Sequence, residues 1–146
     1  LETVASVKAL RKKVYEGYLS NVKSSIFDGV EIQSVDDIRS AQIFEAANNG
    51  DQFAISLIRE TGEKIGIGIA NIVNTLNPEM VVINGEIIST GEILLEPIVS
   101  TVMKRGFRSS VNATKIVLSK LGNMAYLKGA IVLATQHIFD DPDSIM

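Results

Sequence analysis

Two short apolar runs, MVVI at residues 80–83 and KIVLS at 115–119, constrain the fold of this chain most strongly. Both are rich in β-branched side chains, and both are flanked by segments with the three-to-four-residue apolar spacing of helices. Strands that alternate with helices usually pair in parallel, because the intervening helix provides the long crossover that parallel strands need. The sequence therefore predicts an α/β fold with a short, mostly parallel sheet flanked by helices.

Helix-start and helix-stop signals divide the rest of the chain. Ser34 and Asp37 have the spacing of a capping box, and Ser89 and Glu92 repeat it before the fourth helical segment. Pro97 lies within that segment, where it marks either the first turn or a kink. We expect helices at residues 1–19, 36–48, 51–76, 92–106 and 124–139, a polar loop at 20–33 and a turn at 122–123.

The longest segment, which begins at Asp51, carries two stripes of residues. The stripe predicted to be buried is apolar and consists of Ile58, Ile65, Ile69, Ile72 and Leu76. Gly62, Gly66 and Ala70 form a second stripe, in which each glycine costs a helix about 0.5–1 kcal/mol relative to alanine. Close packing of this helix on the sheet is the expected compensation; the alternative is a ligand or a second subunit at the bare backbone.

The run MVVI follows Pro78 and ends at Asn84-Gly85-Glu86. Four consecutive apolar residues between such breaks are typical of a strand buried on both faces. The glycine marks a sharp turn at the end of that strand.

Composition excludes several classes of protein. With 146 residues, 46% of them hydrophobic, the chain can bury one sizeable core, so a single domain over residues 1–146 is expected. The net charge of −3 and a pI of about 5.2 do not fit a nucleic-acid-binding surface. No apolar stretch approaches the ~20 residues of a membrane span, and no secretory signal is visible. These features predict a soluble, cytoplasmic domain without a membrane partner.

No residue set for catalysis or metal binding is present in the sequence. There is no cysteine and a single histidine, His137, so neither a catalytic triad nor a zinc cluster can be assigned. The glycines at 66 and 68 lie in mid-helix and do not form a dinucleotide fingerprint. A basic cluster at Lys8, Arg11, Lys12 and Lys13 could meet phosphates, but a solvated helix face is the preferred interpretation.

Three segments in this order carry a resemblance to a known family: LETVAS at the start, GIGIANIVNTLNPEMVVINGEI in the middle, and LSKLGNMAYLKGAIVLA near the end. Together they resemble the C-terminal half of the ROK family, which comprises sugar-responsive repressors, sugar kinases and uncharacterised proteins. The resemblance implies the C-terminal lobe of an actin/hexokinase-like (ribonuclease H-like) fold. It also implies that the chain is a fragment whose upstream half is missing.

Glu2 is the sugar-binding residue that the resemblance implies. In the family a zinc loop ends in Cys-Leu-Glu, and this glutamate binds sugar hydroxyls; Leu1-Glu2 matches its end. A carboxylate suits this role because it accepts two hydroxyl donors with charge-assisted strength. The alternative is a solvated glutamate at a frayed terminus. The zinc ligands and the catalytic aspartate would lie upstream, so no cofactor is expected within this chain.

The turn Asn84-Gly85-Glu86 matches the glycine-rich turn where nucleotide lies in the family's kinases. Asn84, Gly85 and Glu86 would contact ATP and its magnesium only if the protein is a kinase. This chain keeps one glycine where the family's kinases typically have two or three, which favours a cleft that does not hold ATP.

The resemblance leaves two principal functions open. The favoured one is the effector-binding and dimerising region of a sugar-responsive transcriptional repressor, which would contact DNA only through an upstream domain. The alternative is the C-terminal lobe of an ATP-dependent sugar kinase, and a standalone interaction module is a third possibility. The partners expected are a second copy of the chain and a small sugar or sugar phosphate.

Overall fold

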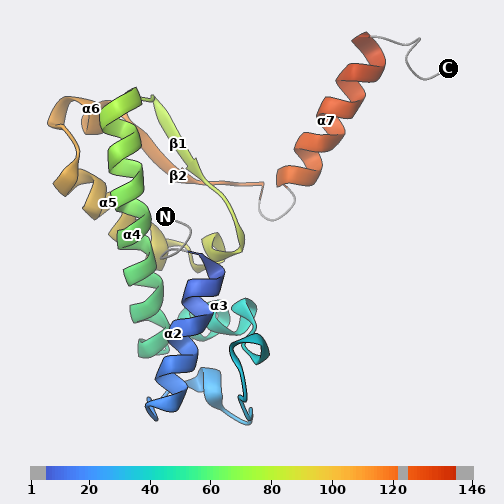
Figure 1. The fold of residues 1–146 in the computed structure, drawn as a ribbon. Helices are drawn as coiled ribbons and strands as arrows, with labels where there is room; N and C mark the ends of the chain where they lie inside the picture. Colours follow the sequence, from blue (N-terminus) through green and yellow to red (C-terminus); the bar gives the residue numbers. More distant parts are fainter. Residues whose placement is uncertain (1–5, 122–124, 141–146) are drawn as a thin grey trace.

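The computed structural model describes residues 6–121 and 125–140. Its elements, in chain order, are α2 (Val7–Leu19), η1 (Ser25–Phe27), η2 (Val35–Asp37), α3 (Ser40–Asn48), α4 (Gln52–Leu76), β1 (Met80–Ile83), η3 (Glu86–Thr90), α5 (Glu92–Arg105), α6 (Arg108–Ala113), β2 (Lys115–Leu118) and α7 (Ala125–Asp140), where η denotes a 3-10 helix. Figure 1 shows α4 as the long central element, with α2 and α3 at one end and the strands near the other.

The long helix α4 begins and ends as the sequence predicts. The Asp51 side chain caps its first turn by accepting a hydrogen bond of 2.9 Å from the Ala54 amide. At the other end Asn77 adopts a left-handed conformation with φ of 45°, and its amide donates to the Val73 carbonyl. Pro78 follows directly and cannot continue the helix.

The small-residue stripe of α4 packs on another helix, so the prediction that it faces the sheet is wrong. A Cβ atom added to Gly62 would lie 2.7 Å from the Pro97 ring and 2.9 Å from the Leu94 carbonyl oxygen. At Gly66 it would lie 2.9 Å from the Ile98 carbonyl oxygen. The two glycines therefore allow α5 to approach α4 closely, and Pro97 lies inside α5 at this contact.

The predicted apolar stripe is buried along only part of α4. Ile58 and Ile69 lie in the core, whereas Ile72 and Leu76 are 47% and 72% exposed. The pattern placed them correctly on one face of the helix, but the described part of the chain does not cover the last two turns of that face.

The sheet has two parallel strands, as predicted, but it is not buried on both faces. β1 pairs with β2 in the register Val81 to Ile116 and Ile83 to Leu118, and these side chains point inward. Met80 and Val82 point the other way and are 53% and 56% exposed. Among the described residues only one face of the sheet is covered, so the apolar run overstated its burial.

Two expected helix starts differ from the structure. Ser34 and Asp37 do form a capping box, but it closes the short helix η2 and not the start of α3. The chain then extends at Ile38, whose side chain is buried, and α3 begins only at Ser40. The predicted Ser89 cap is wrong, because Gly91 precedes α5 and the Ser89 hydroxyl donates to the Glu86 carbonyl.

Two short features were not expected from the sequence. Helix α6 follows α5 directly, and Val111 within it is buried. The loop at 20–33 contributes Ile26 and Ile32 to the core, although its composition is mostly polar.

The last helix, α7, confirms the predicted C-terminal helix. It follows β2 and extends away from the rest of the molecule (Figure 1). Its described side chains include Leu127, Ile131 and Leu133, all at least half exposed. No helix in the described ranges is long and apolar enough to span a bilayer.

Candidate functional site

The turn after β1 leaves bare backbone beside open space. Gly85 has φ of +121°, a conformation that side-chain-bearing residues rarely adopt. A Cβ atom added there would have no neighbour within 4 Å. The sequence predicted a sharp turn with an accessible glycine at this point, and the structure has one.

Glu86 does not simply point into solvent or cap its own turn. Its carboxylate accepts a hydrogen bond of 3.0 Å from the hydroxyl of Ser40, the first residue of α3, although 46 residues separate the two. The side chain that follows the open glycine is therefore fixed across the gap between η3 and α3.

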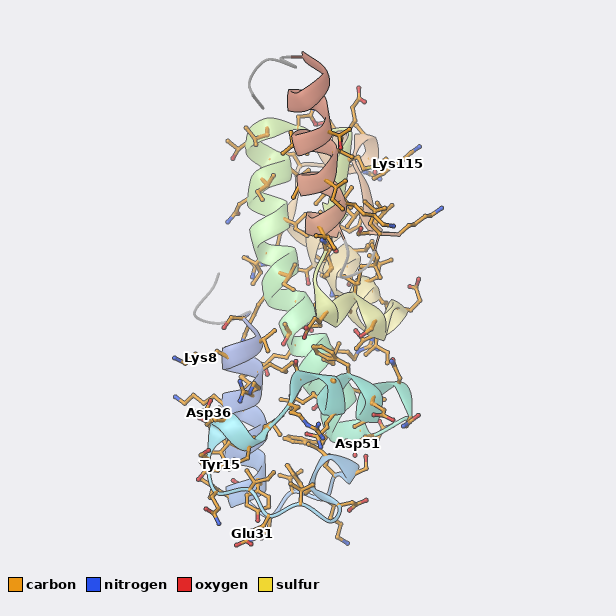
Figure 2. The ribbon with its side chains drawn as sticks, turned by 90° about the vertical axis from the view of Figure 1, so that its right-hand side faces the viewer. Lys8, Tyr15, Glu31, Asp36, Asp51 and Lys115 are labelled. Atoms are coloured by element: carbon orange, nitrogen blue, oxygen red, sulfur yellow. The ribbon has the colours of Figure 1, made fainter. Side chains whose placement is uncertain are left out.

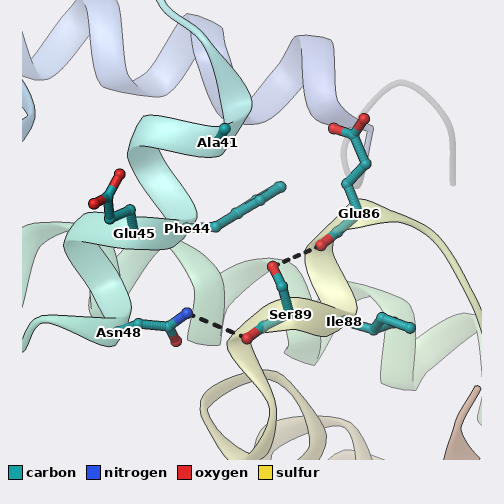
Figure 3. Close-up of a pocket in the computed structure, with 7 residues that line it drawn as sticks. All are labelled: Ala41, Phe44, Glu45, Asn48, Glu86, Ile88 and Ser89. Carbon is teal, nitrogen blue, oxygen red and sulfur yellow. Dashed lines mark hydrogen bonds between the residues drawn. The ribbon is translucent and has the colours of Figure 1, made fainter. Parts of the chain in front are cut away.

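A second contact ties the other end of α3 to η3. The Asn48 side-chain amide donates to the Ser89 carbonyl oxygen at 3.2 Å. Figure 3 shows this bond and the one from the Ser89 hydroxyl to the Glu86 carbonyl, which stabilises η3 itself. The two ends of α3 are thus held against the segment that follows β1.

A cavity of about 510 Å³ lies between these two contacts. Its lining consists of Ala41, Phe44, Glu45 and Asn48 from α3, with Glu86, Ile88 and Ser89 from η3. In Figure 3 the Phe44 ring points from α3 toward η3, whereas the Glu45 carboxylate turns away from it. The lining offers apolar surface, an amide and carboxylates but no basic side chain, so it does not complement a polyphosphate.

Carboxylates with displaced pKa values lie outside this cavity and hold elements together. Hydrogen bonds and charge from Lys13 and Lys64 lower the pKa of Glu60, which joins α2 to α4. Burial acts most strongly on Asp51 and raises its pKa, but its hydrogen bonds together outweigh burial, so the net pKa is lowered. These groups serve the scaffold.

Within the described residues, no group of three or more acidic, histidine or cysteine side chains is arranged to hold a metal ion. Glu2 lies outside the described residues, so the sugar-binding role expected for it is not placed by this geometry.

Comparison with known proteins identifies the family. A model described as the ROK family matches residues 1–137 of this chain. The chain belongs to the ROK family.

Characterised ROK proteins of two kinds resemble this ROK chain. It is 34% identical over 98% of its length to the xylose repressor of Caldicellulosiruptor bescii, covering 35% of that protein. It is 30% identical over 93% of its length to the glucokinase of Halalkalibacterium halodurans, covering 41% of that protein. The chain therefore spans well under half the length of these relatives.

A solved structure confirms the ROK fold. The ROK family glucokinase from Streptomyces griseus, in complex with glucose and AMPPNP, superposes with a TM-score of 0.76 and 28% identity over 92% of this chain and 44% of its own. The fold is accordingly the helix-rich, actin-like one of ROK sugar kinases and regulators, with a short parallel two-stranded sheet.

The sequence of this ROK chain located the turn at 84–86 but not the other half of the site. Ser40, Phe44 and Asn48 were expected only to belong to a short helix, and nothing local to them points to β1. Their contribution arises from the tertiary contact of α3 with η3, which has no signal in a single sequence.

Proposed function

We propose that this ROK chain is the effector-binding and dimerising region of a sugar-responsive transcriptional repressor. The similarity to a xylose repressor over 98% of the chain supports this proposal. Since the chain covers about a third of that relative, the DNA-binding domain and the zinc site would lie in additional sequence before residue 1. In this proposal residues 1–146 form one C-terminal lobe.

The observation that carries the proposal is the contact between Glu86 and Ser40. A nucleotide site at this turn would need bare backbone that a flat ring and a polyphosphate can approach. Here a carboxylate directly follows Gly85 and is fixed by the hydroxyl of Ser40 at 3.0 Å. Like charges a few ångströms apart repel, more strongly where water is partly excluded. This turn therefore disfavours the anionic part of ATP.

Sugar binding is assigned to Glu2 in the same proposal. A carboxylate at that position would accept two hydroxyl donors from a neutral sugar. In a longer protein that carries this chain, Glu2→Gln is expected to weaken sugar binding about tenfold or more, because it removes one charge-assisted interaction.

Self-association completes the proposal. Met80 and Val82 on the open sheet face and Ile131 on α7 are each more than half exposed. Apolar surface of this extent is commonly covered by a partner. We assign that role to a second copy of the chain.

The alternative function is the C-terminal lobe of an ATP-dependent sugar kinase. The identity of 30% with a glucokinase and the open space beside Gly85 favour it. In that case Asn84, Gly85 and Glu86 would lie against the nucleotide, with magnesium bound through the phosphates.

Calorimetric titration with magnesium-ATP separates the two functions. The unmodified protein is expected to bind ATP weakly or not at all. The double variant Asn84→Gly with Glu86→Gly should bind it more tightly, because it removes two side chains and one negative charge from the turn. The single variant Ser40→Ala is the control, since it frees Glu86 but retains its charge. Tight binding by the unmodified protein, with no gain in the double variant, would establish the kinase alternative.

A further inference from the structure

Helix α2 carries its basic residues at the end where they stabilise a helix least. Lys8, Arg11 and Lys12 all lie in its first six residues, its first turn has no acidic residue and its last turn has no basic one. The amino-terminal end of a helix carries a partial positive charge of about half a unit, which favours anions and repels cations. A local conflict of this kind is expected where a functional site is built.

Arg11 is held in place by backbone and side-chain acceptors of the segment beside α2. Its Nη2 donates to the Val35 carbonyl oxygen at 2.9 Å and approaches an Asp36 carboxylate oxygen at 3.4 Å. Its Nε atom is buried without an acceptor among the described residues. The guanidinium is therefore ordered before any ligand arrives, and not all of its hydrogen-bonding capacity is used.

A groove of about 580 Å³ lies over this region. It is lined by Val7, Lys8, Arg11, Lys12, Val35 and Asp36. Figure 2 shows Lys8 on α2 near Asp36 of the adjacent segment. The volume falls in the range of about 300–1,000 Å³ that is usual for small-molecule sites. The two valines add apolar surface beside the three cations.

The negative groups near the groove do not neutralise it fully. Asp36 is the one carboxylate of the lining, and its side chain is 95% exposed. Glu16 pairs with Lys12 at 3.8 Å, but both side chains are largely exposed and such pairs are weak. Hydrogen bonds from Ser34 and Gln33 lower the pKa of the neighbouring Asp37 and engage its carboxylate. Three cations thus face one carboxylate within the groove itself.

We propose that this groove binds a small organic phosphate. The phosphate would lie between Lys8 and Lys12, one helical turn apart, and use the ordered Arg11 fork. The carbon skeleton of the ligand would lie on Val7 and Val35. A concave site beside a carboxylate, in a chain of net charge −3, suits a compact dianion better than a long nucleic-acid strand. The inference concerns a site separate from the turn at 84–86 and does not depend on the proposed function.

Titration monitored by backbone amide NMR tests this site, with glucose 6-phosphate, inorganic phosphate, glucose and a short DNA duplex as the probes. Glucose 6-phosphate is expected to shift the amides of Lys8, Arg11, Lys12 and Asp36 and to bind more tightly than inorganic phosphate or glucose. The affinity should fall as salt is added.

Variants of opposite expected sign separate binding from folding. The double variant Lys8→Gln with Lys12→Gln should weaken binding about tenfold or more. Asp36→Asn should strengthen it by about threefold, since it removes the one carboxylate of the lining. The matched control is Lys104→Gln with Lys115→Gln, which changes the net charge equally at exposed sites outside the groove.

Several outcomes would overturn the inference. These are the absence of glucose 6-phosphate shifts at the groove, equal affinity in the groove variant and the control, or binding of the DNA duplex alone. Glucose binding as tightly as its phosphate would also reject it, while leaving the proposed repressor function intact. Tight magnesium-ATP binding at the turn would reject the proposed function and leave this site unaffected.

Discussion

At the scale of single residues, Asp51 connects two distant parts of the chain through one carboxylate. One oxygen accepts from the Ala54 amide at the start of α4. The other accepts from the Ser25 amide at 2.7 Å and from the hydroxyls of Ser24 and Ser25 at 3.0 Å. The helix cap and the loop at 20–33 therefore depend on the same charged group.

We expect Asp51→Ala to destabilise the chain by about 2 kcal/mol, because it removes an N-cap and the loop hydrogen bonds together. Asp51→Asn should cost less, since asparagine also caps helices well. Urea denaturation of the variants measures both effects. Equal stability of Asp51→Ala and the parent chain would show that the carboxylate holds neither element.

The same residue gives the chain a defined pH dependence. Because the pKa of Asp51 is lowered in the folded state, its stabilising contribution is present above the ordinary value of 3.8 and is lost as the pH falls through the folded-state pKa. Denaturation midpoints measured from pH 6 down to about pH 3 should therefore fall less steeply in Asp51→Asn than in the parent. Parallel profiles would contradict this contribution.

At the scale of elements, the contact of α4 with α5 depends on the absence of side chains. A Cβ atom at Gly66 would lie 2.9 Å from the Ile98 carbonyl oxygen and 2.7 Å from Thr101 Cβ. Because backbone moves less readily than a flexible side chain, the overlap cannot be relieved cheaply.

Gly66→Ala is expected to destabilise the chain by about 1–2 kcal/mol net. Overpacking costs about 1–3 kcal/mol, and alanine returns up to about 1 kcal/mol of helix propensity. Asn71→Ala, on the exposed face of the same helix, is the control and should be neutral or slightly stabilising. Thermal unfolding of the two variants distinguishes steric overlap from propensity, and a stabilised Gly66→Ala would show that α5 can move away.

Local signals in the sequence predicted most of these elements but not their partners. The Asp51 cap, the Asn77-Pro78 stop and the β-branched run after it placed α4 and β1 well, because each depends on chemistry within a few residues. Gly62 and Gly66 signalled close packing without saying that α5 provides it. The burial of β1 was overestimated because an apolar run reports hydrophobicity and not what covers it.

The candidate site shows the same division. Gly85 announced a turn through its backbone freedom, whereas the bond from Ser40 to Glu86 joins residues 46 positions apart. A single sequence gives no information on such a pair.

At the scale of the whole molecule, exposed apolar surface is concentrated at the end that holds the sheet and α7. Val82 and Ile131 are each 56% exposed there. We expect the chain to sediment as a dimer or a larger assembly at tens of micromolar. Val82→Lys should shift it toward monomer, whereas Leu19→Lys, at the far end of α2, should not. A parent chain that sediments as a monomer would contradict self-association.

The measurement that tests the central claim most directly combines sugar binding and phosphoryl transfer in one longer protein that carries this chain. The protein is incubated with a neutral sugar, such as xylose or glucose, and magnesium-ATP. Its melting temperature and the formation of sugar phosphate are then followed together. A repressor is expected to show sugar-dependent stabilisation without formation of sugar phosphate above the uncatalysed background. Steady, enzyme-dependent formation of sugar phosphate would contradict the account and identify the protein as a sugar kinase.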